Sequence, residues 1–279
     1  MRILITGARG MLGQHLGKAL SHHDLTLATR EMLDITRRGA VYDAVFEHDL
    51  VVNAAAYTNV DLAESDEEQA RVINAVAVEH LAHASAAAET RLIQVSTDYV
   101  FDGTASRPYA ESTPCNPRTA YGRTKALGEA AALTIHPEGS IIVRTAWLYG
   151  RYGKNFAATM LRLANSQDSI DVVSDQIGQP TWTWDLARQI RLIIDSRVPP
   201  GIMHGTNSGQ ASWFEFARAI FEESGLDPER IRPISSAQMP RPAPRPAYSV
   251  LDHSRWEQLG LTKPRQWREA LNEASSEGF

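Results

Sequence analysis

The feature that most constrains the fold of this chain is a short apolar run followed at once by three regularly spaced glycines. The run is Ile3-Leu4-Ile5, and Gly7, Gly10 and Gly13 follow in the spacing G-x-x-G-x-x-G. The first glycine allows a tight turn, the second lets the backbone approach a phosphate, and the third lets the next helix lie close to a sheet. Backbone N–H groups at the start of that helix favour negative charge. The sequence therefore predicts a strand, turn and helix that bind a dinucleotide cofactor.

Strand-like and helix-like segments alternate through the first half of the chain, which is typical of parallel βαβ units. We expect strands at 3–5, 25–29, 50–54, 91–95 and 141–144, and helices at 11–20, 38–47, 65–89 and 121–132. The strands are almost entirely apolar, so both faces of the sheet should be covered. We predict an α/β fold, a Rossmann doubly wound parallel sheet, over residues 1–150.

After about residue 150 the pattern changes to short helices and loops. The expected helices lie at 156–165, 183–194 and 213–224, and four prolines gather between residues 240 and 246. We interpret residues 151–279 as a smaller, irregular C-terminal portion that mainly binds substrate. Part of it, about 183–195, is expected to pack back on the first domain.

Composition excludes several classes of function. The formal net charge of −5 gives no reason to expect a nucleic-acid partner. No apolar run approaches the roughly 18 residues of a membrane span, and the N-terminus lacks the basic flank of a signal peptide. The single cysteine, Cys115, cannot form an internal disulfide, which suits a reducing compartment. We expect a cytoplasmic protein with no membrane or nucleic-acid partner.

Two arginines bear on the choice of cofactor. The second strand usually presents an acid to the adenosine ribose of NAD, but here its end carries Arg30, and Arg9 stands inside the glycine loop. Two guanidinium groups suit a 2′-phosphate, so we predict NADPH, with NADH as the alternative and an ordinary surface role for Arg30 left open. Asp34 is expected at the adenine or its ribose, with helix capping as the alternative. The expected cofactor-binding residues are Gly7, Arg9, Gly10, Met11, Leu12, Gly13, Arg30, Asp34, Ile35, Ala54, Ala55, Ala56, Tyr121 and Lys125.

Three further residues form a candidate catalytic set. Reduction of a carbonyl by hydride needs a proton donor to the nascent alkoxide and a group that polarises the carbonyl. Tyr121 and Lys125 are four residues apart in an expected helix and therefore share a face. Lysine next to tyrosine is expected to lower the pKa of the phenol. Thr97 ends an apolar strand, where ligands bind in open α/β sheets. We predict that Tyr121 donates the proton, that Lys125 lowers the pKa of its phenol and that Thr97 orients the substrate.

Longer stretches of the chain resemble the dTDP-4-dehydrorhamnose reductase family of extended short-chain dehydrogenases, whose glycine spacing this chain also has. The matching stretches cover nearly the whole chain, at 52–64, 96–103, 116–117, 121–125, 144–149, 155–156, 175–181 and 242–251. The resemblance implies reduction of the C4 ketone of dTDP-4-dehydro-L-rhamnose to dTDP-L-rhamnose. It also implies that Thr97, Tyr121 and Lys125 are catalytic.

The resemblance extends to the substrate site. The expected substrate-binding residues are Val60, Thr97, Asp98, Tyr99, Trp147, Asn155, Arg241 and Arg245. Plain core packing is the alternative for Val60 and Trp147. Arg241 and Arg245 suit bidentate contact with a diphosphate, and surface charge in a proline-stiffened loop is the alternative.

Departures from the family pattern leave other readings open. Some members dimerise through Mg²⁺ bound by carboxylates, one of them early in the first helix, but this chain has His15 there. We therefore expect no metal, and a monomer or homodimer.

Related ketoreductases of antibiotic deoxysugar pathways, such as dihydrostreptose synthase, use the same catalytic set. The resembling 4,6-dehydratases carry Thr-Asp-Glu where this chain has Tyr99 after Asp98, which favours reduction. A non-catalytic NADP-binding regulatory subunit is a further alternative.

Overall fold

A six-stranded sheet forms the centre of the computed structural model, which describes residues 1–279. Its order is β10-β5-β4-β3-β1-β2, and every neighbouring pair is parallel. The strands are β1 (Arg2–Thr6), β2 (Asp24–Ala28), β3 (Leu50–Asn53), β4 (Arg91–Thr97), β5 (Ser140–Thr145) and β10 (Gly201–His204). The chain starts in β1, goes outward to β2 and then returns to β3 on the other side. This switch in direction is where open α/β sheets bind ligands.

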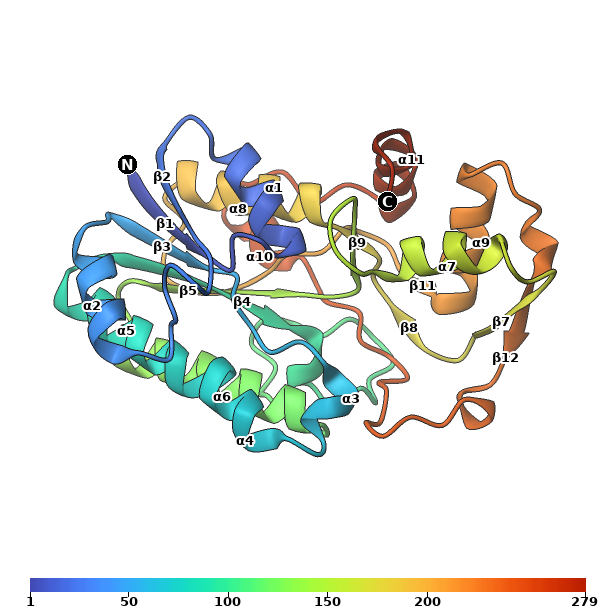
Figure 1. Cartoon of the computed structure of the whole chain (residues 1–279), viewed down its shortest axis with the longest axis horizontal. Coiled ribbons are helices and arrows are strands. Elements are labelled where there is room, and N and C mark those ends of the chain that lie inside the picture. Colours follow the sequence, from blue (N-terminus) through green and yellow to red (C-terminus); the bar gives the residue numbers. More distant parts are fainter.

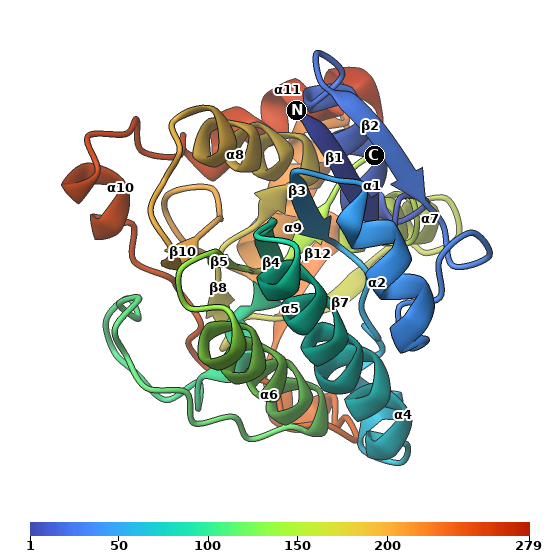
Figure 2. The same cartoon turned by 90° about the vertical axis from the view of Figure 1, so that its left-hand side faces the viewer.

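Helices cover both faces of the sheet, as the apolar strands predict (Figures 1 and 2). Ile3 and Ile5 of β1 pack in an apolar cluster on one face of the sheet, and Leu4 between them packs in a second apolar cluster on the other face. One layer holds α1 (Met11–Ala19) and α8 (Thr183–Asp195), and the other holds α2 (Arg38–Phe46), α5 (Ala77–Ala87) and α6 (Ala120–Ile135). The prediction of a Rossmann-like α/β fold is confirmed.

The expected helix over 65–89 is broken into three pieces. It consists of α4 (Glu67–Arg71), a π-helical turn (Val72–Val76) and α5. The wider turn carries Asn74, which is almost fully buried. The backbone oxygen of Asn74 lies against Gly128 of α6, so closely that a Cβ on this glycine would collide with it.

The C-terminal portion is built from short elements around a third apolar cluster. Its core joins residues of three helices to aromatic side chains such as Trp182, Phe216 and Phe221. The elements are β6 (Leu148–Tyr149), α7 (Phe156–Ala164), β7 (Ile170–Val173), β8 (Ile177–Gly178), β9 (Thr181–Trp182), β11 (Ala211–Ser212), α9 (Trp213–Glu223), β12 (Ile231–Ile234), α10 (Ser254–Gln258) and α11 (Trp267–Glu277).

The two portions share their core. α8 lies against α1, and β10 forms an edge of the main sheet, although both come after residue 150. Trp256 of α10 is fully buried in the same cluster as Ile3 and Ile5. A division at residue 150 into a cofactor-binding and a substrate-binding part therefore stays a prediction about function. The fold itself is not divided there, because α8 and β10 come later in the chain and complete the sheet and its cover.

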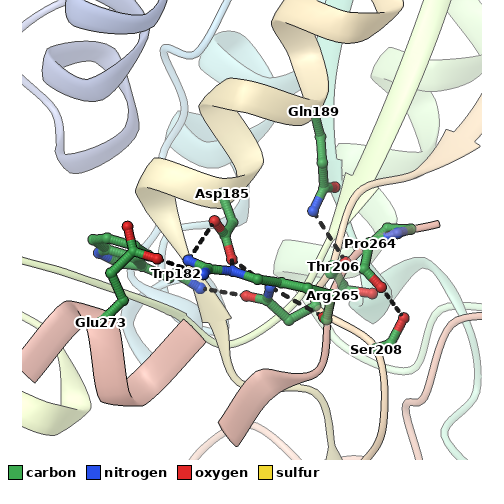
Figure 3. Close-up of polar contacts among 9 residues, drawn as sticks. Trp182, Asp185, Gln189, Thr206, Ser208, Pro264, Arg265 and Glu273 are labelled. Atoms are coloured by element: carbon green, nitrogen blue, oxygen red, sulfur yellow. Dashed lines mark hydrogen bonds and ion pairs between the residues drawn. The ribbon is translucent and has the colours of Figure 1, made fainter. Parts of the chain in front are cut away.

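Arg265 links these portions at one point (Figure 3). Its guanidinium donates to both carboxylate oxygens of Asp185 on α8, at 2.7 and 2.9 Å, and also pairs with Glu273 on α11. The same group lies over the ring of Trp182, 5.5 Å from its centre. The helix that covers the sheet is therefore fixed to the last helix of the chain. No helix has the length and apolar character that crossing a membrane requires.

Candidate active site

The glycine loop lies at the switch point between β1 and β3. Gly7 adopts a φ of +67°, a conformation that favours glycine, and a Cβ there would lie 2.7 Å from the backbone nitrogen of Ala55. Gly13 lies against the backbone of Gly7 and Ala8 too closely to carry a side chain. The loop, the helix start and the end of β3 therefore meet, which brings Ala54 and Ala55 beside the glycines.

The start of α1 has the character of an anion site. Gly10 caps the helix without a side chain, and no acid stands in the first turn. Backbone N–H groups of that turn are consequently left for a ligand. These features fit the diphosphate of a dinucleotide. The side chains of Leu12 and Ile35 are each 6% exposed and lie in the apolar clusters on the two faces of the sheet.

The predicted 2′-phosphate residues gather at the end of β2. Arg9 pairs with Glu31 at 3.1 Å, and both side chains are exposed. Arg9 and Arg30 both help to lower the pKa of Glu31, after the larger effect of its hydrogen bonds. The Asp34 carboxylate accepts hydrogen bonds from the backbone and side chain of Thr36, at 3.0 and 2.7 Å. Both arginines thus act on Glu31 just after β2, and their contact with a phosphate stays a prediction.

The three expected catalytic residues meet at the carboxyl end of β4. Thr97 is the last residue of this strand and is 5% exposed. Tyr121 lies in the first turn of α6, with its ring centre 5.7 Å from that of Tyr99, and its hydroxyl interacts with that of Thr97. Lys125, one turn later, is buried and donates from Nζ to the carbonyl oxygen of Val95 at 2.6 Å.

Burial dominates the electrostatics of the phenol. It raises the pKa of Tyr121 to about 12, the Thr97 hydroxyl opposes the shift, and the nearby Asp98 adds to it. The expectation that Lys125 lowers the pKa of Tyr121 is wrong for this structure. The ammonium group is turned toward the backbone of β4, and the phenol feels burial and the Asp98 charge instead. Tyr121 is therefore neutral at pH 7 and carries a proton to give.

Two more groups in the site are shifted by burial. Burial lowers the pKa of Lys125 to about 8, although Glu129 opposes this. It raises the pKa of Asp98 to about 6, although hydrogen bonds, among them that donated by Thr97 at 3.0 Å, hold it down. Perturbed groups collected at a strand end are typical of active sites.

The expected sugar-pocket residues fall in two places. Tyr99 and Asp98 lie with the catalytic group, whereas Trp147 stacks on Trp213 of α9, with ring centres 3.6 Å apart. Trp147 has a φ of +46°, an unfavourable conformation for a bulky residue of the kind that collects at functional sites. Asn155 is 9% exposed and caps α7, accepting from the backbone of Ala158 at 3.0 Å. Their contact with a sugar stays a prediction.

The two predicted diphosphate arginines converge on one carboxylate. Arg245 donates to Asp61 at 2.8 Å, and Arg241 lies 3.9 Å from the same oxygen. Asp61 stands in α3 (Val60–Ala63), directly after the predicted sugar-pocket residue Val60. Sequence reasoning assigned no role to Asp61.

Two other residues around the site were also missed. The Asn74 side chain accepts from the backbone nitrogen of Tyr57 at 2.9 Å and donates to its carbonyl oxygen at 3.1 Å, and it donates to Thr124 of α6 at 3.2 Å. It thus joins the loop after β3 to the catalytic helix. A single asparagine in an alanine-rich helix was the available signal. Nothing in the sequence around Trp213 indicated its stacking on Trp147.

His15 takes a structural position in α1. It is 2% exposed, and its Nδ1 lies 2.8 Å from the Thr183 hydroxyl of α8. Burial lowers its pKa to about 4, so the ring is neutral at pH 7. This residue joins the two helices of one layer.

Comparison with known proteins gives the family of the chain. Residues 1–278 match the family model described as the RmlD substrate binding domain. The chain is 50% identical to a probable dTDP-4,6-dihydroxy-2-methyloxan-3-one 4-ketoreductase of Streptomyces antibioticus, over 98% of this chain and 94% of the relative. It is 48% identical to a dTDP-4-dehydrorhamnose reductase of Streptomyces griseus, over 98% and 92%. A crystal structure of dTDP-4-dehydrorhamnose reductase from Bacillus anthracis in complex with NADP superposes with a TM-score of 0.95, at 37% identity and 99% coverage of both chains.

Fold and site together define an oxidoreductase of the extended short-chain dehydrogenase class, with a glycine loop at the sheet switch point and a Thr-Tyr-Lys set at the end of β4. Within that class, the chain belongs to the RmlD family, the family of the dTDP-4-dehydrorhamnose reductases.

Proposed function

We propose that this protein reduces the C4 ketone of a dTDP-4-keto-6-deoxy-L-sugar with NADPH, and that the sugar is dTDP-4-dehydro-L-rhamnose. The observation that carries this proposal is the meeting of Thr97, Tyr121 and Lys125 at one strand end in a chain of the RmlD family. The NADP complex of the Bacillus anthracis relative supports the choice of cofactor.

Each residue has a defined task in this chemistry. NADPH, when bound at the glycine loop, supplies the hydride. In the substrate complex the Thr97 hydroxyl would turn from Asp98, to which it donates here, and donate instead to the ketone oxygen, which polarises the carbonyl. Tyr121, neutral because burial raises its pKa to about 12, gives its proton to the developing alkoxide. Lys125 lies one helical turn away, where its ammonium can contact the ribose hydroxyls of the cofactor.

The residue after Asp98 argues against dehydration. Acid and base chemistry at C5 and C6 needs a second carboxylate, and this chain has Tyr99 instead. Burial, the largest effect, raises the pKa of this phenol above its ordinary value, so it is neutral and cannot act as a base at pH 7. Simple reduction is the reaction that the site supports.

A related substrate is the second candidate, because the relative from Streptomyces antibioticus carries the name of a 4-ketoreductase for a different dTDP-sugar. The same catalytic group would act on either ketone, so the choice between them would be made by residues that contact the rest of the sugar, for which Trp147 is the predicted candidate. A cytoplasmic location and the number of subunits stay predictions.

The direct assay follows the loss of reduced-nicotinamide absorbance when the protein meets enzymatically prepared dTDP-4-dehydro-L-rhamnose. NADPH and NADH are run side by side, and the product is compared with dTDP-L-rhamnose by chromatography. We expect oxidation of NADPH in preference to NADH, since Arg9 and Arg30 stand near the glycine loop. Intact cofactor binding without oxidation would exclude this sugar and favour the second candidate, and an absence of NADPH binding would contradict the proposal as a whole.

A further inference from the structure

The proline-rich segment Pro240–Pro246, here called the strap, cannot form the regular backbone hydrogen bonds that hold a strand in a sheet. Prolines at every second position remove every second N–H donor. The segment is nevertheless well packed at its centre, because Ala243 is 1% exposed. Its position must therefore come from contacts with other parts of the chain.

One carboxylate supplies the central contact. Asp61 accepts a hydrogen bond from the backbone nitrogen of Ala243 at 3.3 Å and another from Nη2 of Arg245 at 2.8 Å. The guanidinium of Arg241 lies 3.9 Å away. Arg245 also donates to the carbonyl oxygen of Ala243 at 3.1 Å, which closes a small ring of contacts around the carboxylate. A short segment without regular structure is thus held by a half-buried ionic hydrogen bond.

The helix that carries Asp61 is itself joined to the catalytic helix. The Asn59 side chain caps α3 by accepting from the backbone nitrogen of Leu62 at 3.1 Å. Glu64, just past its end, accepts from the backbone nitrogen of Ala120 at 2.9 Å, where α6 begins. Tyr121 is the next residue. The strap is therefore fixed to the same structural unit as the proton donor.

A cavity of about 350 Å³ lies where the strap meets the segment that follows β4. Tyr99, which lies against Tyr121, shares its lining with Arg118 and Arg245. At the strap's far end, Pro246 packs against Gly103, where a Cβ would collide with the proline ring. The cavity therefore has at one side Tyr99, whose ring lies against that of Tyr121, and at the other two guanidinium groups.

We propose that Asp61 is a positioning residue, which docks the strap on α3 and thereby holds Arg245 beside Tyr99, where it binds the diphosphate of the nucleotide-sugar. This inference rests on the proposed function, because the diphosphate belongs to the proposed dTDP-sugar substrate. Asp61 does not cancel the cationic character of the cavity mouth, since Arg118, Arg241 and Arg245 oppose it. Two acids, Asp61 and Asp102, stand among these three cations, which still leaves net positive charge for the ligand.

Two readouts separate docking from substrate binding. Hydrogen–deuterium exchange of the peptide that contains Ala243 reports docking and needs no ligand. Calorimetric affinity for dTDP, together with KM and kcat, reports the consequence. Asp61→Ala removes both acceptors, whereas Asp61→Asn keeps an acceptor and removes the charge. The control is Asp49→Ala, because Asp49 likewise accepts from the backbone nitrogen and Nη2 of an arginine, Arg2, both at 2.8 Å, at the opposite end of the strands.

We expect Asp61→Ala to speed exchange in the strap and to raise both the Kd for dTDP and the KM for the sugar by about tenfold, while kcat stays within about twofold and NADPH affinity is unchanged. Asp61→Asn should weaken dTDP binding with a smaller change in exchange, and Asp49→Ala should change none of these.

Unchanged strap exchange in Asp61→Ala would overturn the docking role. Faster exchange with unchanged dTDP affinity would overturn the link to Arg245. If the wild-type protein bound no dTDP and turned over no sugar, the proposed function would fail and the diphosphate role with it, while the exchange experiment would still decide whether Asp61 docks the strap.

Discussion

At the scale of single residues, the site is governed by burial more than by ion pairing. Lys125, Tyr121 and Asp98 all have their pKa values shifted mainly by removal from water. Burial therefore keeps Tyr121 protonated at pH 7 and makes the ionised form of Asp98 energetically unfavourable. The cost of that charge is measurable as stability, because a pKa shift is a difference in proton affinity between folded and unfolded chains.

Replacing Asp98 by asparagine should stabilise the protein at neutral pH. Burial raises the pKa of Asp98 from 3.8 to about 6, so the stability that this group gives is present below the unfolded value and is lost as the pH rises through about 6. The loss amounts to about 3 kcal/mol at most. Asparagine keeps an acceptor for the Thr97 hydroxyl and does not ionise. Urea unfolding at about pH 4 and about pH 7 should therefore show the variant gaining on the wild type as the pH rises.

An exposed carboxylate provides the control for this measurement. Asp43 lies on the outer side of α2, and Asp43→Asn should follow the wild-type pH dependence. A constant difference between Asp98→Asn and the wild type across the same pH range would show that Asp98 is not destabilised by burial.

At this scale the sequence predicted which residues lie together, but not where the ammonium group of Lys125 points. Thr97 at a strand end and the four-residue spacing of Tyr121 and Lys125 predicted which residues meet, because both follow from backbone periodicity. The direction of Lys125 Nζ, toward the carbonyl of Val95, depends on packing that spacing does not contain. The pairing of Arg245 with Asp61 spans 184 residues and has no local signal.

At the scale of elements, the alternation of apolar runs predicted the first five strands and their helices to within a few residues. The π-helical turn Val72–Val76 was not predicted, and the contacts of its Asn74 lie on elements distant in sequence. Its Asn74 backbone meets Gly128 of α6, and its side chain holds the loop after β3. β10 was missed as well, since a four-residue edge strand after a proline pair has little periodicity of its own.

Gly128→Ala should destabilise the protein even though alanine favours a helix. The new methyl group would collide with the backbone oxygen of Asn74, and overpacking of this kind costs about 1–3 kcal/mol. Gly39→Ala is the matched control in a helix, because nothing lies within 4 Å of the added carbon. It should leave stability unchanged or raise it by up to about 1 kcal/mol. Equal behaviour of the two variants in urea unfolding would contradict the close contact between α6 and the π-helical turn.

At the scale of the whole molecule, the cofactor portion and the C-terminal portion share one core. α8 and Trp256 fill the core under the sheet, and Arg265 joins α8 to α11. Composition and motif order predicted two portions with different tasks. They could not predict how much of the second completes the first, because that depends on contacts between residues far apart in sequence.

Arg265→Gln should therefore destabilise the entire chain. It leaves Asp185, whose side chain is 6% exposed, without its cation, and breaking a largely buried pair costs about 2–4 kcal/mol. Far-UV circular dichroism and loss of NADPH binding should shift together in urea. The control Arg268→Gln removes an exposed pair with Glu222 and should cost about 0–1 kcal/mol. Separate transitions for the two probes would contradict a shared core.

The most direct test of the central claim is a single-turnover experiment with NADPH carrying deuterium at its transferable position and dTDP-4-dehydro-L-rhamnose, run on the wild type and on Tyr121→Phe. We predict deuterium at C4 of dTDP-L-rhamnose, formed about 10² to 10⁴ times more slowly by the variant, with NADPH affinity nearly unchanged. Transfer to C4 at the wild-type rate by Tyr121→Phe, or no deuterium at C4 with the wild type, would contradict the account.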